Sequence, residues 1–189
     1  MQDIRDAIDT RGVLEGAAVR LAAERITNDG ELSTIRKINA EIDEVSQPYV
    51  LVPGTVPSAA ELTRYAELNT QFHAAFFDLA KSPMLRWTAA RIESIPFAGP
   101  KSVVMSRGIE FLTIAQEHHH AIIDAIANRE GSRAESLARE HARLARRNME
   151  MALAQYEHSL STRVWGATLI RTDTSDFRNV TGMPDADIR

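Results

Sequence analysis

Residues 112–126 read LTIAQEHHHAIIDAI and combine a strong helical signal with a cluster of histidines. Apolar side chains recur every three or four positions through this stretch, which is typical of one face of an amphipathic helix. That face passes through His119, whereas His120 falls on the polar side together with Gln116. His118 lies at the edge between the two faces. The stretch therefore predicts a helix that turns the imidazole of His119 into a protein core.

The rest of the chain predicts further helices of the same kind. Its 9 glycines and 7 prolines gather in a few places and leave long segments with an apolar period of about 3.6 residues. The sequence predicts an all-α fold, an antiparallel bundle of about six helices that encloses a central chamber for a ligand or metal. The expected helices cover residues 4–26, 31–45, 58–81, 83–95, 101–128 with a bend near Gly108, and 132–156.

Caps and breaks set these boundaries. Residues 58–61 and 132–135 both have the spacing of a capping box, in which a serine and a glutamate satisfy free backbone N–H groups at a helix start. Ser82 is a suitable cap before a proline at the first helical position. Three prolines and a glycine predict the main loop at residues 48–57, and Gly131 is expected to close the helix before it.

Composition limits the possible functions. The 189 residues are 44% apolar, carry a formal net charge of −4 and contain no cysteine. These values exclude disulfide scaffolds and thiolate metal sites, and they do not suit unaided binding to nucleic acid. No apolar run is long enough for a membrane span, and residues 1–6 are too acidic and too polar to open a secretory signal, so a cytoplasmic protein is expected. We expect one helical domain at residues 1–157 and a polar tail at residues 158–189.

Polar side chains on the apolar faces of three helices are the informative exceptions. Asn69 and His73 lie one turn apart on one inward face, and His119 and His141 point inward from two other helices. Burial of each such group without a partner costs about 1–3 kcal/mol, and one shared metal would satisfy all four. The pattern therefore predicts a divalent metal held by these residues. Zn²⁺ is the first choice, and Ni²⁺, Mn²⁺ and Fe²⁺ are compatible because no thiolate selects among them.

Two arginines are candidates for binding an anion beside this metal. Arg11 falls on the apolar stripe of the first helix, where a guanidinium needs a carboxylate partner. That partner is either Glu15, one turn later, or the carboxylate of a bound effector. Arg91, near Trp87 on the fourth helix, is a second candidate for the effector.

Several segments together resemble a known family, the FCD effector domain of the FadR branch of GntR-family transcriptional regulators. The resemblance covers about residues 3–154 and rests on four segments in order. These are RGVLE with LAAER at residues 11–25, LNTQFH at 68–73, HHAIIDAI at 119–126, and Ala134 with His141.

The resemblance implies a homodimeric domain that binds a divalent metal and a small organic acid and thereby modulates DNA binding. It places Asn69, His73, His119 and His141 at the metal positions, and Arg11 at the arginine of the first helix. Two departures stand out. Asn69 occupies a position that is often aspartate in the family, and no winged helix-turn-helix precedes the domain in this sequence, so DNA contact is expected only through a domain absent from this chain.

A metal-dependent hydrolase is the alternative function, because three histidines with an open position could activate a water molecule. The sequence has no His-Glu-x-x-His motif, and no inward carboxylate is obviously placed as a general base. A regulatory, non-enzymatic domain is therefore expected. The basic positions along residues 139–147 alternate with Glu140 and are interpreted as a solvated helix face.

Overall fold

The structure is a computed structural model that describes residues 2–52, 55–95, 98–100 and 109–165. Within these ranges the chain forms six α-helices and one short 3-10 helix, with no strand, which confirms the all-α prediction. The elements in order are α1 (Gln2–Arg25), η1 (Asp29–Leu32), α2 (Ser33–Leu51), α3 (Ala59–Leu79), α4 (Pro83–Glu93), α5 (Ile109–Ala127) and α6 (Gly131–Trp165). The chain divides into two compact units, residues 1–152 and 153–189.

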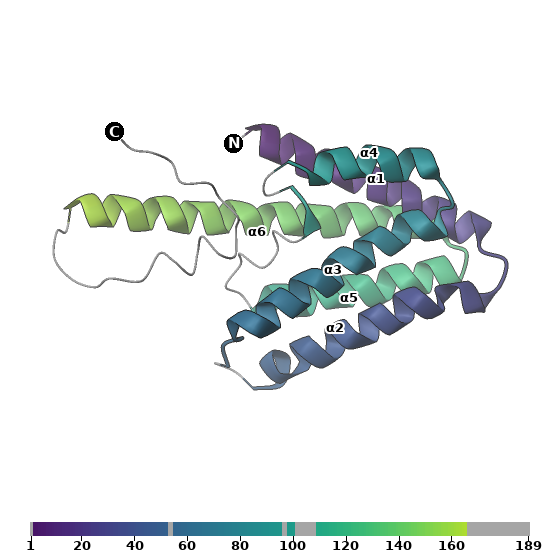
Figure 1. Cartoon of the computed structure of the whole chain (residues 1–189), viewed down its shortest axis with the longest axis horizontal. Helices are drawn as coiled ribbons and strands as arrows, with labels where there is room; N and C mark the ends of the chain where they lie inside the picture. Colours follow the sequence, from purple (N-terminus) through teal and green to yellow (C-terminus); the bar gives the residue numbers. More distant parts are fainter. Residues whose placement is uncertain (1, 53–54, 96–97, 101–108, 166–189) are drawn as a thin grey trace. The chain divides into compact units, whose positions relative to one another are not determined.

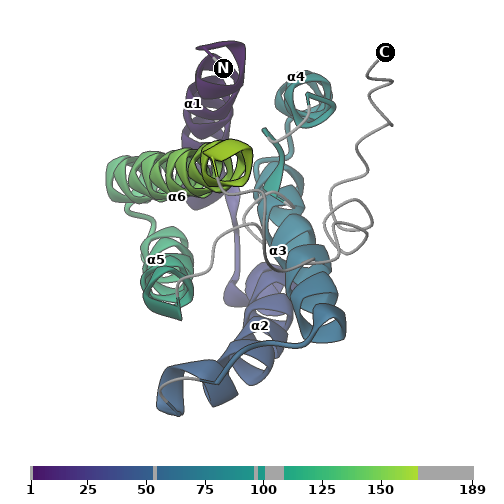
Figure 2. The same cartoon turned by 90° about the vertical axis from the view of Figure 1, so that its left-hand side faces the viewer.

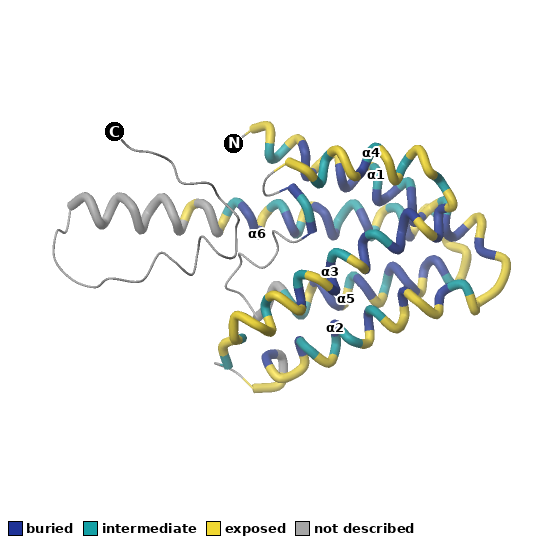
Figure 3. The backbone as a smooth tube through the Cα atoms, viewed as in Figure 1, coloured by how far each residue is buried: buried dark blue, intermediate teal, exposed yellow. Residues whose placement is uncertain are grey.

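The first unit holds the packed core. Helix α2 contacts α3 and α5, and α1 contacts α3, α4 and α5 (Figure 1). Seen from the side, α1 and α2 lie at opposite ends of this group, with α3 and α5 between them (Figure 2). Each helix turns a buried stripe inward and an exposed stripe outward (Figure 3). Burial of these stripes supplies most of the stability, at about 25 cal/mol per Å² of apolar surface.

Two of the predicted helix starts have the expected caps. The Ser58 hydroxyl accepts a bond from the Glu61 backbone N–H at 3.3 Å, and the Glu61 carboxylate accepts one from the Ser58 N–H at 2.9 Å. This is the reciprocal capping box that the sequence predicts for α3. At α4 the Ser82 hydroxyl accepts from the Leu85 N–H at 3.4 Å, ahead of Pro83 at the first helical position.

The predicted break at Pro48 is wrong, because α2 continues through this proline to Leu51. Proline removes one helical hydrogen bond, but near a helix end the loss is small compared with what the last turn gains from packing. Tyr49 is buried and its hydroxyl bonds the Glu61 carboxylate, which ties the last turn of α2 to the first turn of α3. The packing of Tyr49 against α3 therefore outweighs the tendency of Pro48 to end the helix.

The junction between α5 and α6 also differs from the prediction. The left-handed residue after α5 is Arg129, with φ 59°, rather than Gly131. Glu130 N donates to Ala125 O at 2.8 Å and Arg129 N to Ile126 O at 3.0 Å, the pattern of a Schellman motif. Gly131 instead begins α6, so Ser132 is inside the helix and is not its cap, and Ala134 N bonds Glu130 O.

The last helix is longer than predicted, since α6 reaches Trp165 and not about Tyr156. Serine and threonine are only about 0.5 kcal/mol per residue worse than alanine in a helix. A few of them do not end a helix that is already propagating. The division into a domain at 1–157 and a tail at 158–189 stays a prediction. The bend expected near Gly108 lies outside the described residues.

None of the helices in the described part of the chain is long and apolar enough to span a membrane.

The arginines on the basic face of α6 form ion pairs with neighbouring carboxylates. Arg139 pairs with Glu135 at 2.7 Å, and Arg143 pairs with Glu140 at 3.0 Å. Arg146 reaches Asp9 of α1 at 2.8 Å. These ion pairs fit the interpretation of this face as a solvated surface.

Candidate metal centre

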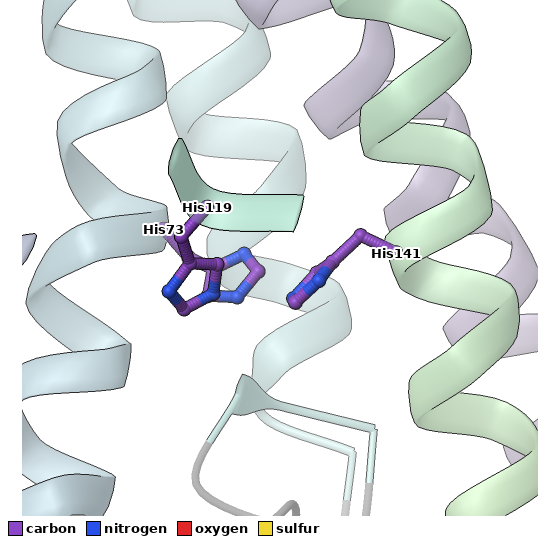
Figure 4. Close-up of side chains that lie close together, drawn as sticks. All are labelled: His73, His119 and His141. Carbon is purple, nitrogen blue, oxygen red and sulfur yellow. The ribbon is translucent and has the colours of Figure 1, made fainter. Parts of the chain in front are cut away.

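Three buried imidazoles meet in the first unit. His73 of α3, His119 of α5 and His141 of α6 each offer one ligand nitrogen, and these nitrogens all lie within 4.8 Å of one another. The ring centroids are 5.9 Å apart for His73 and His119, 5.2 Å for His73 and His141, and 4.8 Å for His119 and His141. Figure 4 shows the three side chains turned toward a common point.

The chemistry of this donor set fits a transition metal. His73 Nε2, His119 Nε2 and His141 Nδ1 are all buried without a hydrogen-bond partner. Unpaired buried nitrogens are costly, and neutral imidazole is a preferred ligand of Zn²⁺, Ni²⁺ and Fe²⁺. One ion bound to these three residues would remove the cost at each of them.

Asn69 lies one helical turn before His73 and is almost completely buried. Its Nδ2 donates to the backbone carbonyl of Pro100 at 3.0 Å. The amide nitrogen is therefore held by the segment that follows α4. Only the side-chain oxygen of Asn69 is chemically suited to a metal.

Arg11 and Glu15 form a buried ion pair beside the histidines. Arg11 Nε lies 3.3 Å from Glu15 Oε1, and its Nη1 donates to Ala98 O at 2.6 Å. The structure thus pairs Arg11 with its neighbour one turn away, which was one of the two alternatives from the sequence. Glu15 Oε1 also lies 2.9 Å from His73 Nδ1, although this contact lacks the alignment of a good hydrogen bond.

Burial and neighbouring charges together set the pKa values of the groups in this cluster. Burial raises the pKa of Glu15, but the charges of His73 and Arg11 outweigh it and leave this pKa below its usual range. Burial also lowers the pKa of His119 and His141 well below the ordinary value, and the neighbouring histidines lower both further. Glu93 of α4 is half-buried, and both burial and the charge of Glu15 raise its pKa. The cluster therefore favours neutral His119 and His141 next to an ionised Glu15.

Two polar residues that sequence analysis missed support His119. Gln116 was assigned to the polar face, but it is buried, and its Oε1 lies 3.1 Å from His119 Nδ1. Its Nε2 donates to Asn39 of α2, to Oδ1 at 2.8 Å and to the backbone oxygen at 3.3 Å. No local pattern identifies this role, because the partner is 77 residues away in the sequence.

The other two histidines of α5 lie away from the convergence point. His120 is more than half exposed, and its Nε2 lies 3.0 Å from Asp43. His118 is partly buried, with its ring 5.8 Å from that of His141. His119 is therefore the inward histidine, as the helical period indicates.

Arg91 lies outside this cluster. It is exposed on α4, with its guanidinium 4.8 Å from the centre of the Trp87 ring in a cation–π contact. Of the two arginines predicted to bind an effector, the structure places only Arg11 beside the histidines.

The chain matches a known protein family. The model of the FCD domain matches residues 6–144. Among solved structures, E. coli McbR/YncC is similar, with a TM-score of 0.60 and 16% sequence identity over 80% of this chain and 65% of that chain. At this identity the likeness concerns the fold alone, and the chain spans about two thirds of the length of that protein. A comparison with curated proteins finds no match.

Proposed function

Because the chain belongs to the FCD domain family, we propose that it is the effector-sensing domain of a GntR-family transcriptional regulator. In this proposal it binds a divalent metal together with a small carboxylate. The observation that carries the metal part is the meeting of His73, His119 and His141, each with a buried nitrogen that has no partner. The oxygen of Asn69 is the proposed fourth ligand.

A metal held by three neutral imidazoles and an amide would keep its full positive charge and attract an anion. A buried cation beside the histidines is Arg11, whose guanidinium is shared between Glu15 and the Ala98 carbonyl. A carboxylate effector would compete with that carbonyl for the Nη1 end of the fork. Binding energy gained in this way could then favour one arrangement of the helices over another.

In this proposal, the effect of the effector on DNA binding requires the whole regulator. We propose that the domain forms a homodimer and acts on DNA through a winged-helix domain of the same protein. The hydrolase alternative is less well supported, because Glu15, the carboxylate that contacts His73, is already paired with Arg11. A carboxylate with a lowered pKa is a poor general base.

The metal part is tested by elemental analysis of protein purified without chelator and by calorimetric titration of the chelator-treated protein with Zn²⁺. The His119→Ala variant should lose affinity by at least about tenfold. The matched control is Glu117→Ala, an exposed position on the same helix, which should bind Zn²⁺ nearly as the wild type does. No bound transition metal and no Zn²⁺ binding by the wild type would contradict the metal site.

The effector part is tested by thermal melts of the metal-loaded protein with citrate as the probe. Citrate should raise the melting temperature of the wild type more than that of Arg11→Lys, which keeps the charge but loses the fork. Arg91→Lys is the matched control, because Arg91 lies outside the cluster. Equal shifts in the wild type and Arg11→Lys would contradict a role for Arg11.

A further inference from the structure

His119 can bind a metal through Nε2 only if its proton is on the other ring nitrogen. A neutral imidazole carries one proton, and the hydrogen bond at one nitrogen determines which of the two carries it. The residue that faces Nδ1 therefore decides whether the lone pair of Nε2 points to the site. That residue is Gln116, with Oε1 at 3.1 Å.

The backbone carbonyl of Asn39 sets the orientation of the Gln116 amide, because a backbone carbonyl cannot exchange its acceptor for a donor. Its Nε2 lies 3.3 Å from the backbone oxygen of Asn39, which can only accept a hydrogen bond. If the amide were flipped, its oxygen would face that carbonyl oxygen. The Asn39 side-chain oxygen, at 2.8 Å, accepts a second bond from the same nitrogen. The amide oxygen of Gln116 must therefore face His119.

With an acceptor at Nδ1, the His119 ring carries its proton there and donates it to Gln116. Its Nε2 then carries a lone pair and is buried with no hydrogen-bond partner. Phe72 stacks on the same ring, with centroids 4.0 Å apart and planes at 24°, and so limits its rotation. The ring is thus held on one face by Phe72 and at one edge by Gln116, and it points toward His73 and His141 (Figure 4).

We propose that Gln116 is a positioning residue of the metal centre. Asn39 orients the Gln116 amide, and Gln116 holds His119 as the Nδ1–H tautomer, so that Nε2 is the ligating nitrogen. The consequence for metal binding rests on the proposed function. The tautomer itself does not, because it follows from hydrogen bonds within the metal-free protein. Polar partners behind ligating histidines typically change metal affinity by about 10- to 100-fold.

The first test is nitrogen-15 NMR of the histidine side chains in chelator-treated protein at about pH 8, where an ordinary imidazole is neutral. Wild-type His119 should be protonated on Nδ1. Gln116→Met, which has similar volume but no strong acceptor, should give a mixture of tautomers. Gln116→Glu should restore Nδ1 protonation, because a carboxylate accepts the same bond. Gln71→Met, at an exposed position of α3, is the matched control and should resemble the wild type.

If Gln116→Met does not fold, the tautomer of wild-type His119 still decides the test, because that measurement needs no variant. Asn39→Ala removes one of the two acceptors that orient Gln116 but keeps the backbone carbonyl, so His119 should stay protonated on Nδ1. Nε2 protonation of His119 in the wild type, or an unchanged tautomer in folded Gln116→Met, would overturn the proposal.

The second test is Zn²⁺ titration of the same variants. Gln116→Met should bind Zn²⁺ about 10- to 100-fold more weakly than the wild type and Gln71→Met do. Equal affinity would overturn the positioning role in metal binding. Absence of Zn²⁺ binding by every protein, with the tautomer results as expected, would instead count against the proposed function and leave the assignment of Gln116 intact.

Discussion

At the scale of single residues, the pair of Arg11 and Glu15 connects stability to the candidate site. Both side chains are buried, and Glu15 reaches His73 as well as the guanidinium. Two charges taken out of water cost several kcal/mol, and their attraction repays this only while both are present. The loss of either residue therefore leaves an uncompensated charge in the core.

We predict that Arg11→Met and Glu15→Leu each lower the free energy of unfolding by about 3–5 kcal/mol, whereas the double variant loses much less than the sum. Urea unfolding of the three variants measures this. Arg20→Met is the control, since its pairs with Glu24 and Glu135 lie at the surface and its loss should change stability little. Additive losses would show that the pair is not coupled.

Sequence reasoning at this scale identifies buried polar residues but not their partners. The helical period is enough to place His73, His119 and His141 on inward faces, because side-chain direction in a helix depends on position alone. It assigns Gln116 to the wrong face, and it does not single out Asn39, which is buried. Their roles depend on each other across α2 and α5, and no local pattern contains such a pair.

At the scale of elements, α1 and α6 approach closely at Gly12. A Cβ atom added there would lie 2.6 Å from Ala142 Cβ, closer than two carbon atoms can pack. Glycine is required here for packing and not for its backbone freedom.

We predict that Gly12→Ala destabilises the protein by about 1–3 kcal/mol, because overpacking outweighs the roughly 1 kcal/mol that alanine gains in helix propensity. Ala142→Gly in the same protein should recover part of the loss. Gly16→Ala is the control. Its Cβ would meet flexible side-chain atoms of Arg139 and Glu135 at 3.2 Å and the Glu135 backbone oxygen at 3.3 Å, so it should cost much less than Gly12→Ala. Thermal or urea unfolding measures all of these, and a neutral Gly12→Ala would contradict the close contact.

At the scale of the whole molecule, the buried histidines make stability depend on pH. In the folded protein the pKa values of His119 and His141 lie well below 6.5, because burial disfavours the charged ring and neighbouring histidines add to this. In the unfolded chain both return to about 6.5, so the unfolded state binds more protons as the pH falls below that value. Their contribution is fully present above about pH 6.5 and is lost below it.

We predict that the chelator-treated protein loses up to about 1.4 kcal/mol per pH unit for each of these two histidines as the pH falls from about 6.5. Glu15, whose folded pKa is lowered, adds a further loss below its ordinary value of 4.5. Urea unfolding at about pH 7 and about pH 5 measures the first loss, and His119→Leu should reduce the slope. Equal stability at both pH values would contradict the prediction.

The sequence by itself determined which segments are helical, the caps of α3 and α4, and which imidazoles face inward, since these follow from periodicity and from hydrogen bonds within a few residues. Only the tertiary structure decided that α2 continues through Pro48, that Arg129 closes α5, and that Asn39 supports His119 through Gln116. Each of these depends on groups that are distant in the chain, and their energies exist only once the helices have packed.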